Sequence, residues 1–436
     1  MIFTPISGAG RGKRLRREEL SGVYDEGCHL PVSTMVADIT GQDTEETGLV
    51  FASGDADKLA RPVPQTLVRA PWLGARAAQF LTSLYELDGT PNALDPRHVL
   101  RGVLERFAAD GLTPVVACEL EFYLVDPERT KEGGIRLPML PMGDGRPPRL
   151  HNAYDLRDLD DVAPFLEELW SVADVQGVPL QGAVAEYAPA QYELTLKHKA
   201  DALRAADDAL MYKRLTKGVA RRHGFEATFM AKPFQARSGS GLHLHVSVNG
   251  ADGSNVFASE DPAGSAVMRH AIGGMKALLG DGMAIYAPNA NSYRRFKANS
   301  YAPVAPGWGI NNRTLPLRVP IGPAHTRHIE QRVAGADANV YLALAAMLAS
   351  VHHGISTKAD PGAPIEGSGY AAAESSGIRL PTHWLAALDA LERSKVMRAY
   401  LGDRFVDMFV CVKRVEFDRF NEVVPSLDYD WYLKNA

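Results

Sequence analysis

The sequence is poor in the features that mark several classes of protein. It has only three cysteines in 436 residues, Cys28, Cys118 and Cys411, and no two of them form a CxxC pair. Neither a disulfide framework nor a zinc knuckle is therefore indicated, and a reducing compartment such as the cytoplasm fits. The formal net charge is only -5, which gives no overall attraction to nucleic acid. This composition favours small molecules as partners.

Two sequence signals of nucleotide-binding and membrane proteins are also missing. No GxxxxGK[ST] segment occurs, which argues against a P-loop nucleotide fold. The most apolar helical stretch, residues 340–351, is far shorter than the roughly 20 residues of a membrane span, so we expect a core helix and no membrane association.

The N-terminus lacks an apolar signal-peptide core and carries a basic cluster instead. Its members are Arg11, Lys13, Arg14, Arg16 and Arg17. A targeting or phosphate-binding role and a solvated strand or loop edge are both open. We favour the second interpretation because the cluster has no amphipathic helix pattern.

The chain is long enough for two domains of unequal size. Short strands and turns are expected as far as Pro96, and a helix pattern then starts after Asp95-Pro96. We therefore expect a small domain over residues 1–97 and a large one over residues 98–436. Further helices are expected at residues 160–175, 199–223, 264–279 and 338–353, and surface loops at residues 143–149 and 358–376.

Four strand patterns in the large domain carry polar side chains on one face. In residues 115–125, Glu119 and Glu121 alternate with buried-type residues, and in residues 242–248 the alternating polar residues include His243 and His245. The other two segments place Gln191, Glu193 and Thr195 on one face, after Glu186 and a bend, and His328, Glu330 and Arg332 on another.

On one strand alone, such a face would be an ordinary solvated surface. Its recurrence on four strands indicates a concave sheet whose polar face gathers carboxylates, imidazoles and a guanidinium. Carboxylate oxygens suit Mg²⁺, and an added imidazole favours tolerance of Mn²⁺. Five glutamates and one histidine could hold two or more ions.

Arginines near Gly-, Pro- and Asn-rich turns supply the complementary charge. They are Arg294, Arg295, Arg313, Arg318 and Arg332. Guanidinium groups match the geometry of carboxylates and phosphates, and together with metal ligands they indicate transfer of a phosphoryl group.

These motifs, in order and spacing, resemble the glutamine synthetase family over nearly the whole chain. The matching segments are GDADKLARPVPQTL (54–67), GTPNALDPRHVL (89–100), ELEFYLV (119–125), AEYAPAQYEL (185–194), GSGLHLHVSV (239–248), NSYRRF (291–296), NNRTLPLRVP (311–320) and HIEQRVAGADANVYLALAA (328–346). The resemblance implies an α+β fold, with an N-terminal β-grasp domain and a catalytic domain whose curved antiparallel sheet is flanked by helices.

The resemblance also implies a role for each matching residue. Glu121, Glu186 and Glu193 would hold a first metal ion, and Glu119, His243 and Glu330 a second one. The implied substrate-binding residues are Gly239, Arg295, Arg332 and Tyr301, the ATP-binding residues are His245, Ser247, Arg313 and Arg318, and the catalytic arginines are Arg295, Arg313 and Arg332. Two or three Mg²⁺ or Mn²⁺ ions per site, and ATP as co-substrate, are implied.

Departures from the family pattern bear on the second substrate. Where ammonia-using members show a glutamate in a flap, this sequence has Tyr301, and Ser238 and Trp308 also differ from the usual residues. An ammonium cation held only by a phenol would be poorly compensated. The implied reaction is therefore ATP-dependent joining of glutamate to an organic amine through γ-glutamyl phosphate, as in the γ-glutamyl-polyamine or monoamine synthetases.

Several alternatives are open at the level of sequence. The chain could be an ammonia-using glutamine synthetase or a relative that has lost catalysis. Asp38 and Asp57 could reach the active site of a neighbouring subunit or serve turns and surface. The resemblance implies a homo-oligomer, a dodecamer of two hexameric rings.

Overall fold

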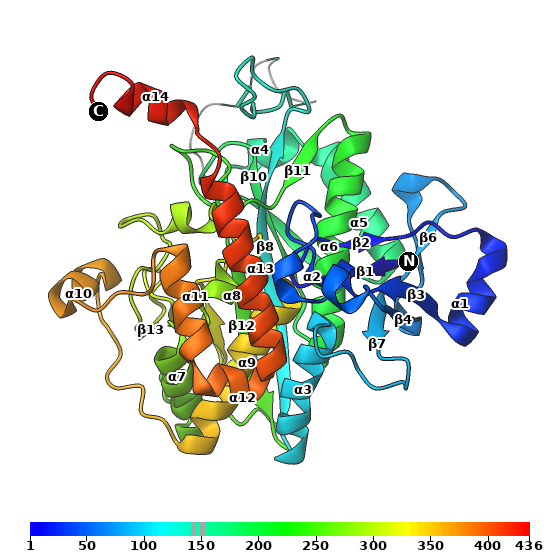
Figure 1. The fold of residues 1–436 in the computed structure, drawn as a ribbon. Helices are drawn as coiled ribbons and strands as arrows, with labels where there is room; N and C mark the ends of the chain where they lie inside the picture. The colour runs from blue at the N-terminus through cyan, green and yellow to red at the C-terminus, as the bar shows by residue number, and fades with distance from the viewer. Residues whose placement is uncertain (141–144, 146, 149–152) are drawn as a thin grey trace.

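The chain forms an α+β fold built around one large sheet. The computed structural model describes residues 1–436 apart from 141–144, 146 and 149–152. In Figure 1, strand β8 runs through the middle of the molecule, with helices around it and the N-terminal elements gathered on one side. The expected α+β class and helix-flanked sheet are confirmed.

Among the described residues, the large sheet has eight strands. They are β8 (Thr113–Val125), β9 (Leu180–Ala185), β10 (Gln191–Leu196), β11 (Glu226–Thr228), β12 (Leu242–Asn249), β13 (Trp308–Ile310), β14 (Leu317–Val319) and β15 (Ile329–Gln331). Their order is β13-β14-β15-β12-β8-β10-β9, and β11 pairs with the end of β8. All pairs are antiparallel except β13 with β14, so the predicted antiparallel sheet is mixed at this edge.

The predicted alternation of faces is confirmed on the two central strands. On β12, the side chains of Leu242, Leu244, Val246 and Val248 are fully buried. The matching residues of β8, from Val116 to Leu124, are buried in the same hydrophobic core. This layer holds the sheet against the helices and turns the polar side chains of both strands to the opposite face.

The five expected helices are present, with ends shifted by a few residues. They are α3 (Pro96–Ala109), α5 (Ala163–Gln176), α6 (Ala202–Arg222), α7 (Ala266–Leu278) and α9 (Val340–Thr357). The other α-helices are α1 (Leu20–Glu26), α2 (Ser33–Val36), α4 (Leu156–Asp160), α8 (Met283–Tyr286), α10 (Gly369–Ser376), α11 (Trp384–Arg393), α12 (Lys395–Leu401), α13 (Asp403–Asn421) and α14 (Ser426–Tyr432).

The loop predicted over residues 358–376 is wrong at its end. Helix α10 occupies that end, and the side chain of Ser368 caps it by accepting from the backbone N–H of Ala371. Three consecutive alanines in α10 favour a helix there. Most of the other predicted loop, residues 143–149, lies outside the described residues.

Helix α3 begins where the sequence predicts. Pro96 is its first residue, and the carboxylate of Asp95 accepts from the backbone N–H of Arg97. The other oxygen of Asp95 accepts from the backbone N–H of Leu84 at 2.6 Å. One buried carboxylate therefore ties the start of α3 to the N-terminal strand β7 (Thr82–Tyr85), and burial raises its pKa to about 6.

Helix α9 is the expected core helix. By length and composition alone it could cross a membrane, but 78% of its 18 residues are buried inside the fold. It packs against α7 where two glycines meet: a Cβ on Gly274 would lie 2.4 Å from the Cα of Gly354. The crossing is thus too close for any side chain at Gly274.

The N-terminal strands form small separate sheets. β3 (Cys28–Pro31), β4 (Asp57–Pro62) and β7 form a three-stranded antiparallel sheet. Two-stranded pairs are formed by β1 (Ile2–Phe3) with β2 (Arg11–Gly12) and by β5 (Val68–Arg69) with β6 (Ala78–Gln79). The β-grasp arrangement and the boundary at residue 97 stay predictions.

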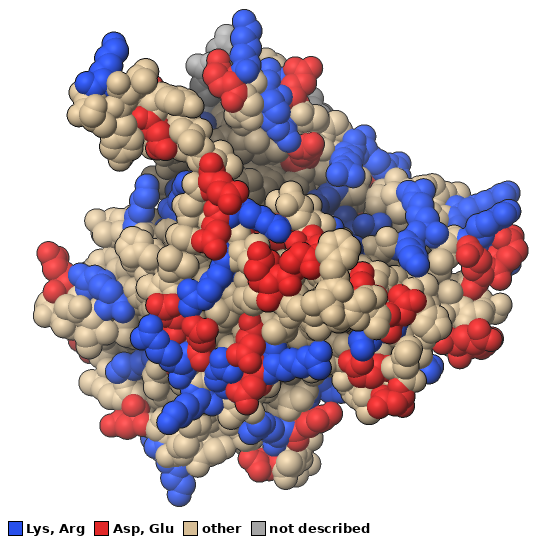
Figure 2. Space-filling model, viewed as in Figure 1, with Lys and Arg blue, Asp and Glu red and all other residues tan. Residues whose placement is uncertain are grey.

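The three cysteines are free, as expected. On the face shown in Figure 2, Lys and Arg side chains are interspersed with Asp and Glu side chains over most of the surface. Such mixing is typical of a solvated protein surface.

Candidate active site

The register of the central strands brings the predicted ligands side by side. Glu119 on β8 lies opposite His243 on β12, and Glu121 lies opposite Glu193 on β10. On the next strand, Glu330 of β15 lies opposite His245 of β12. Like charges on directly opposite residues destabilise a sheet, so the pairing of Glu121 with Glu193 needs compensation from a cation or a proton.

The first predicted set of ligands is assembled. Glu121, Glu186 and Glu193 each offer a carboxylate oxygen, and these oxygens lie within 4.8 Å of one another. Glu186 reaches the set through the turn between β9 and β10. In this turn its backbone N–H donates to the backbone carbonyl of Gln191 at 2.8 Å. Among the described residues, the only ion-pair contacts of this set are with His243, at 3.8 Å.

The electrostatics of this first set favour an added cation. Burial, followed by the charge of Glu121, raises the pKa of Glu186 to about 7. Burial, followed by the charge of Glu119, raises the pKa of Glu193 well above its ordinary value. Among the described residues no arginine or lysine forms an ion pair with these three converging carboxylates, and such a donor set suits a hard divalent cation.

The second predicted set is also assembled, with one addition. His243 Nδ1 lies 3.3 Å from Glu119 Oε2 and 3.8 Å from Glu330 Oε1. His245 Nε2 lies 3.1 Å from the other oxygen of Glu119, which makes His245 a further candidate ligand with Glu119 and Glu330. Burial raises the pKa of Glu119, but hydrogen bonds from the two histidines outweigh it and lower that pKa.

Two predicted arginines bind the buried carboxylate of Glu330. Arg332 Nη1 donates to Glu330 Oε1 at 2.5 Å, and Arg318 Nη1 donates to Oε2 at 2.7 Å. Burial opposes ionisation, but the charge of Arg332 and the neighbouring histidines lower the pKa of Glu330 to about 2. Nε of each arginine is buried and has no partner among the described residues, so both can still donate to a ligand.

Arg295 is held by the backbone. Its guanidinium donates to the carbonyls of Val333 at 2.7 Å and Ala334 at 3.1 Å, and it is 93% buried. Burial lowers its pKa. The backbone therefore fixes this charge beside the first ligand set before any substrate arrives.

Two glycines make room for that guanidinium. A Cβ on Gly239, a predicted substrate-binding residue, would lie 2.6 Å from the carbonyl oxygen of Ala231 and 2.8 Å from Arg295 Cγ. At Gly241 it would lie 2.9 Å from Arg295 Nη2. Gly241 also donates its backbone N–H to Glu121 at 2.9 Å, so the segment both orients a ligand and seats the arginine.

The other predicted residues have different degrees of exposure. Ser247 is buried on the polar face of β12, next in the alternation after His243 and His245. Arg313 is exposed on the loop before β14, and Tyr301 is exposed with a φ of 57°. A bulky residue in the left-handed region is uncommon, so the turn at Tyr301 is strained.

Sequence reasoning did not assign Gln191 to the site. Its Nε2 donates to Glu121 Oε2 at 3.1 Å and to the carbonyl of Gly239 at 3.0 Å, which joins a predicted ligand to the predicted substrate pocket. The signal was present, because Gln191 shares the polar face of its strand with Glu193. Amide side chains are common on the polar faces of strands. Only the pairing of the strands shows that Gln191 links Glu121 to Gly239.

Asp38 serves a turn of its own chain. One oxygen accepts from the backbone N–H groups of Thr40, Gly41 and Gln42, and the other accepts from Arg419 at 2.5 Å. Its side chain is buried, so of the two open interpretations the structure favours the turn.

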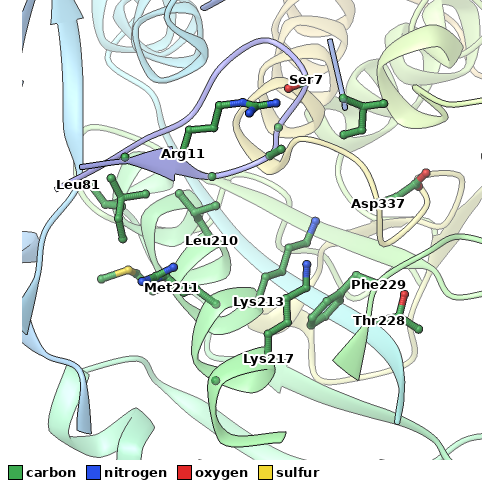
Figure 3. Close-up of a pocket in the computed structure, with 18 of the residues that line it drawn as sticks. Ser7, Arg11, Leu81, Leu210, Met211, Lys213, Lys217, Thr228, Phe229 and Asp337 are labelled. Carbon is green, nitrogen blue, oxygen red and sulfur yellow. The ribbon is translucent and has the colours of Figure 1, made fainter. Parts of the chain in front are cut away.

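A large cavity lies apart from these ligands. It has a volume of about 860 Å³ and is lined by the N-terminal loop, by α6 and by residues near Asp337. Figure 3 shows Lys213 and Lys217 of α6 beside Phe229, with Arg11 across from them. Arg11, Lys13 and Arg14 of the N-terminal basic cluster thus lie on a short strand and loop that border this cavity.

Comparison with known proteins finds one family over most of the chain. Residues 93–432 match the family model described as glutamine synthetase, catalytic domain. The chain is 37% identical to the gamma-glutamylputrescine synthetase PuuA of Escherichia coli (strain K12), over 100% of the chain and 91% of that protein. It is 32% identical to the gamma-glutamylethanolamide synthetase of Streptomyces coelicolor, covering 100% and 91%, and 32% identical to the glutamate–isopropylamine ligase of a Pseudomonas species, covering 98% and 93%.

A solved structure shares the whole fold. The complex of GmaS with ADP superimposes with a TM-score of 0.85 at 28% identity, covering 99% of this chain and 95% of that one.

Proposed function

Because the chain belongs to the glutamine synthetase family, we propose that it joins the γ-carboxylate of glutamate to an organic amine, a polyamine or a monoamine. The chain is an ATP-dependent carbon–nitrogen ligase, and its relatives include a gamma-glutamylputrescine synthetase, a gamma-glutamylethanolamide synthetase and a glutamate–isopropylamine ligase. The observation that carries the proposal is the convergence of all six predicted ligands, and the sequence adds Tyr301 at the position of the predicted flap.

The described residues fit divalent cations, and we propose two or three Mg²⁺ or Mn²⁺ ions. Glu121, Glu186 and Glu193 would hold one ion, and Glu119, His243 and Glu330 another, with His245 beside them. When bound, the first ion would organise the glutamate side of the site, and the second would neutralise charge at the phosphates of ATP.

The arginines would act on the charges of the two substrates. Arg295 and Arg332 would bind the carboxylate of glutamate and the phosphoryl group in transfer, with Gly239 in the wall of the glutamate pocket. Arg313 and Arg318, with His245 and Ser247, would bind ATP. Arg295 and Arg332 are already fixed by carbonyls and by Glu330, so they need little reorganisation when charge develops during the reaction.

The reaction takes two displacements. An oxygen of the γ-carboxylate attacks the γ-phosphorus of ATP, the bond to the bridging oxygen breaks, and ADP leaves with that electron pair. The neutral amine nitrogen then attacks the acyl carbon of γ-glutamyl phosphate, phosphate leaves, and the nitrogen loses a proton to give the amide. Holding the partners together in one hollow lowers the entropic cost of both steps.

Tyr301 is the residue on which the choice of amine rests. A carboxylate at this place would compensate a small ammonium ion, whereas a phenol offers an aromatic surface and one hydroxyl. An amine with a carbon chain gains apolar contact with that surface, whereas ammonium has no carbon with which to make such contact and gains only cation–π attraction. The acceptor is therefore an organic amine.

Larger-scale organisation follows from the same resemblance. We propose a β-grasp domain over residues 1–97, a catalytic domain over residues 98–436, assembly into a dodecamer of two hexameric rings, and a cytoplasmic location.

The test is a panel of amines. Phosphate release from ATP and glutamate is measured with ammonium, methylamine, ethanolamine, isopropylamine and putrescine, and kcat/KM is expected to be highest for one of the organic amines. Tyr301→Glu is expected to shift preference toward ammonium by about tenfold, and Tyr301→Phe, which keeps the ring, is the matched control.

Two outcomes would overturn the proposal. A preference of the wild-type protein for ammonium would make the chain an ammonia-using glutamine synthetase. Absence of ATP turnover with every amine, in protein that binds Mg²⁺ and ATP, would make it a relative without catalysis.

A further inference from the structure

Three histidines converge beside the carboxylate ligands. His198 follows β10, His245 lies within β12, and His328 precedes β15, so three separate segments supply them. One ring nitrogen from each lies within 4.8 Å of the others, and the ring centroids are 5.2 to 5.7 Å apart. Three ring nitrogens at this spacing could bind one ion if the rings turned toward it.

The tautomer of His328 is set by a carbonyl. His328 Nδ1 lies 2.8 Å from the backbone oxygen of Thr326, which can only accept. The proton therefore sits on Nδ1, and Nε2 keeps a free lone pair. Metal-binding histidines commonly hold their second nitrogen in this way, with a carbonyl or carboxylate that fixes the ring.

His245 faces a carboxylate. Its Nε2 lies 3.1 Å from Glu119 Oε1, so Nε2 is the ring nitrogen turned toward that carboxylate. His245 is 94% buried, and neither of its ring nitrogens has a well-aligned hydrogen bond among the described residues. A buried polar nitrogen without a partner is costly, and a ligand at this point would remove that cost.

We propose that His198, His245 and His328 bind a transition metal ion of the zinc class, at a centre that shares only His245 with the carboxylate ligand sets. Three neutral imidazoles suit Zn²⁺, Co²⁺ or Ni²⁺, whereas Mg²⁺ prefers oxygen. His198 is exposed, which gives an ion access from solvent and leaves a fourth position for water.

The arrangement makes His245 a bridge between two centres. Nδ1 would bind the transition metal, while Nε2 faces Glu119, a proposed ligand of the divalent cation. Binding at the three histidines would therefore fix the orientation of Glu119. The histidine centre itself does not depend on the proposed ligase reaction.

The test measures metal binding directly. Tag-free full-length protein is stripped with a chelator and dialysed against Zn²⁺ or Co²⁺ in a large excess of Mg²⁺, and bound metal is counted by mass spectrometry. Wild type is expected to retain one ion per chain more than His198→Ala or His328→Ala, and each variant to bind that ion at least about tenfold more weakly. The Co²⁺ protein is expected to show a visible absorption band that both variants lose.

The chain offers a matched control three residues from His328. His325 is exposed and lies outside the cluster, so His325→Ala is expected to behave as wild type. Urea midpoints of the metal-free variants establish that they fold. Equal stoichiometry and affinity in wild type, His198→Ala and His328→Ala would overturn the proposal, as would a loss of the same size in His325→Ala.

Discussion

The two predicted ligand sets form two halves of the carboxylate site, which balance their charge in opposite ways. The paired half is the set of Glu119, His243 and Glu330, and the unpaired half is the set of Glu121, Glu186 and Glu193. Glu330 is held by Arg318 and Arg332, and its pKa is lowered to about 2. Glu186 and Glu193 have no such partner among the described residues, and burial raises the pKa of Glu186 to about 7. In one half the charge of Glu330 is therefore balanced by arginines of the chain, whereas the charge of the other half has to be balanced by a cation or by protons.

The largest effect on stability is expected at the paired half. Glu330→Gln leaves two buried guanidinium groups without their carboxylate, and the free energy of unfolding should fall by about 3 kcal/mol. The measurement is urea unfolding in the presence of a chelator. Glu226→Gln removes an exposed partner of Arg129 and should cost less than about 1 kcal/mol. Equal effects of the two changes would break the comparison.

At the unpaired half, the same substitution should act on activity instead of stability. Glu193→Gln removes a proposed ligand, and kcat/KM for amide formation should fall by at least about a hundredfold. The metal-free variant should be at least as stable as wild type at pH 8, because a repelling buried charge is gone. A metal-free variant clearly less stable than wild type would show that the three glutamates are compensated within the chain.

The pH dependence should separate the two halves. A carboxyl whose folded pKa is raised favours folding below its unfolded pKa, and this contribution is lost as pH rises through the folded pKa. For Glu186 that window runs from 4.5 to about 7, whereas Glu330, with a lowered pKa, loses its contribution only as pH falls from 4.5 toward about 2.

In a chelator, the stability of Glu186→Gln relative to wild type should therefore grow between pH 4.5 and 7. Saturating Mg²⁺ should abolish that growth, because the bound cation requires the ionised carboxylates. Thermal unfolding at several pH values, with and without Mg²⁺, measures it. A difference that stays constant across this range in the chelator would contradict the assignment of Glu186 to the unpaired half.

The smallest effect on stability is expected when the guanidinium geometry of Arg318 is lost but its charge is kept. Arg318 bridges Glu330 at 2.7 Å and Asn311 at 2.8 Å, through two different nitrogens. Arg318→Lys keeps the charge but loses the fork, and should cost about 1 kcal/mol in urea unfolding. A cost as large as that of Glu330→Gln would mean that the fork, and not the charge, balances Glu330.

The sequence was most informative in the strands, because alternate side chains of a strand lie on the same face of the sheet. Alternation placed Glu119 with Glu121, and His243 with His245, on the polar face, and the structure agrees. Alternation says nothing about register between strands, so it could not place Gln191 between Glu121 and Gly239, nor His198 beside His328. Those neighbours depend on how far each strand slides along the next.

Short elements were predicted less well. The parallel pairing of β13 with β14 and the helix α10 involve few residues, and local pattern alone carries little information over such lengths. The exposure of Arg313 could not be predicted either, because the sequence of a loop does not show whether its arginine points into a site or into solvent.

Gly241 keeps a small space open where three functional side chains meet. A single methyl group there would stand within 3.4 Å of Arg295, His243 and Glu121 at once. This space lets the guanidinium, the imidazole and the carboxylate approach one another without a carbon atom between them. A version of this protein that keeps the same chemistry must therefore keep a glycine at position 241.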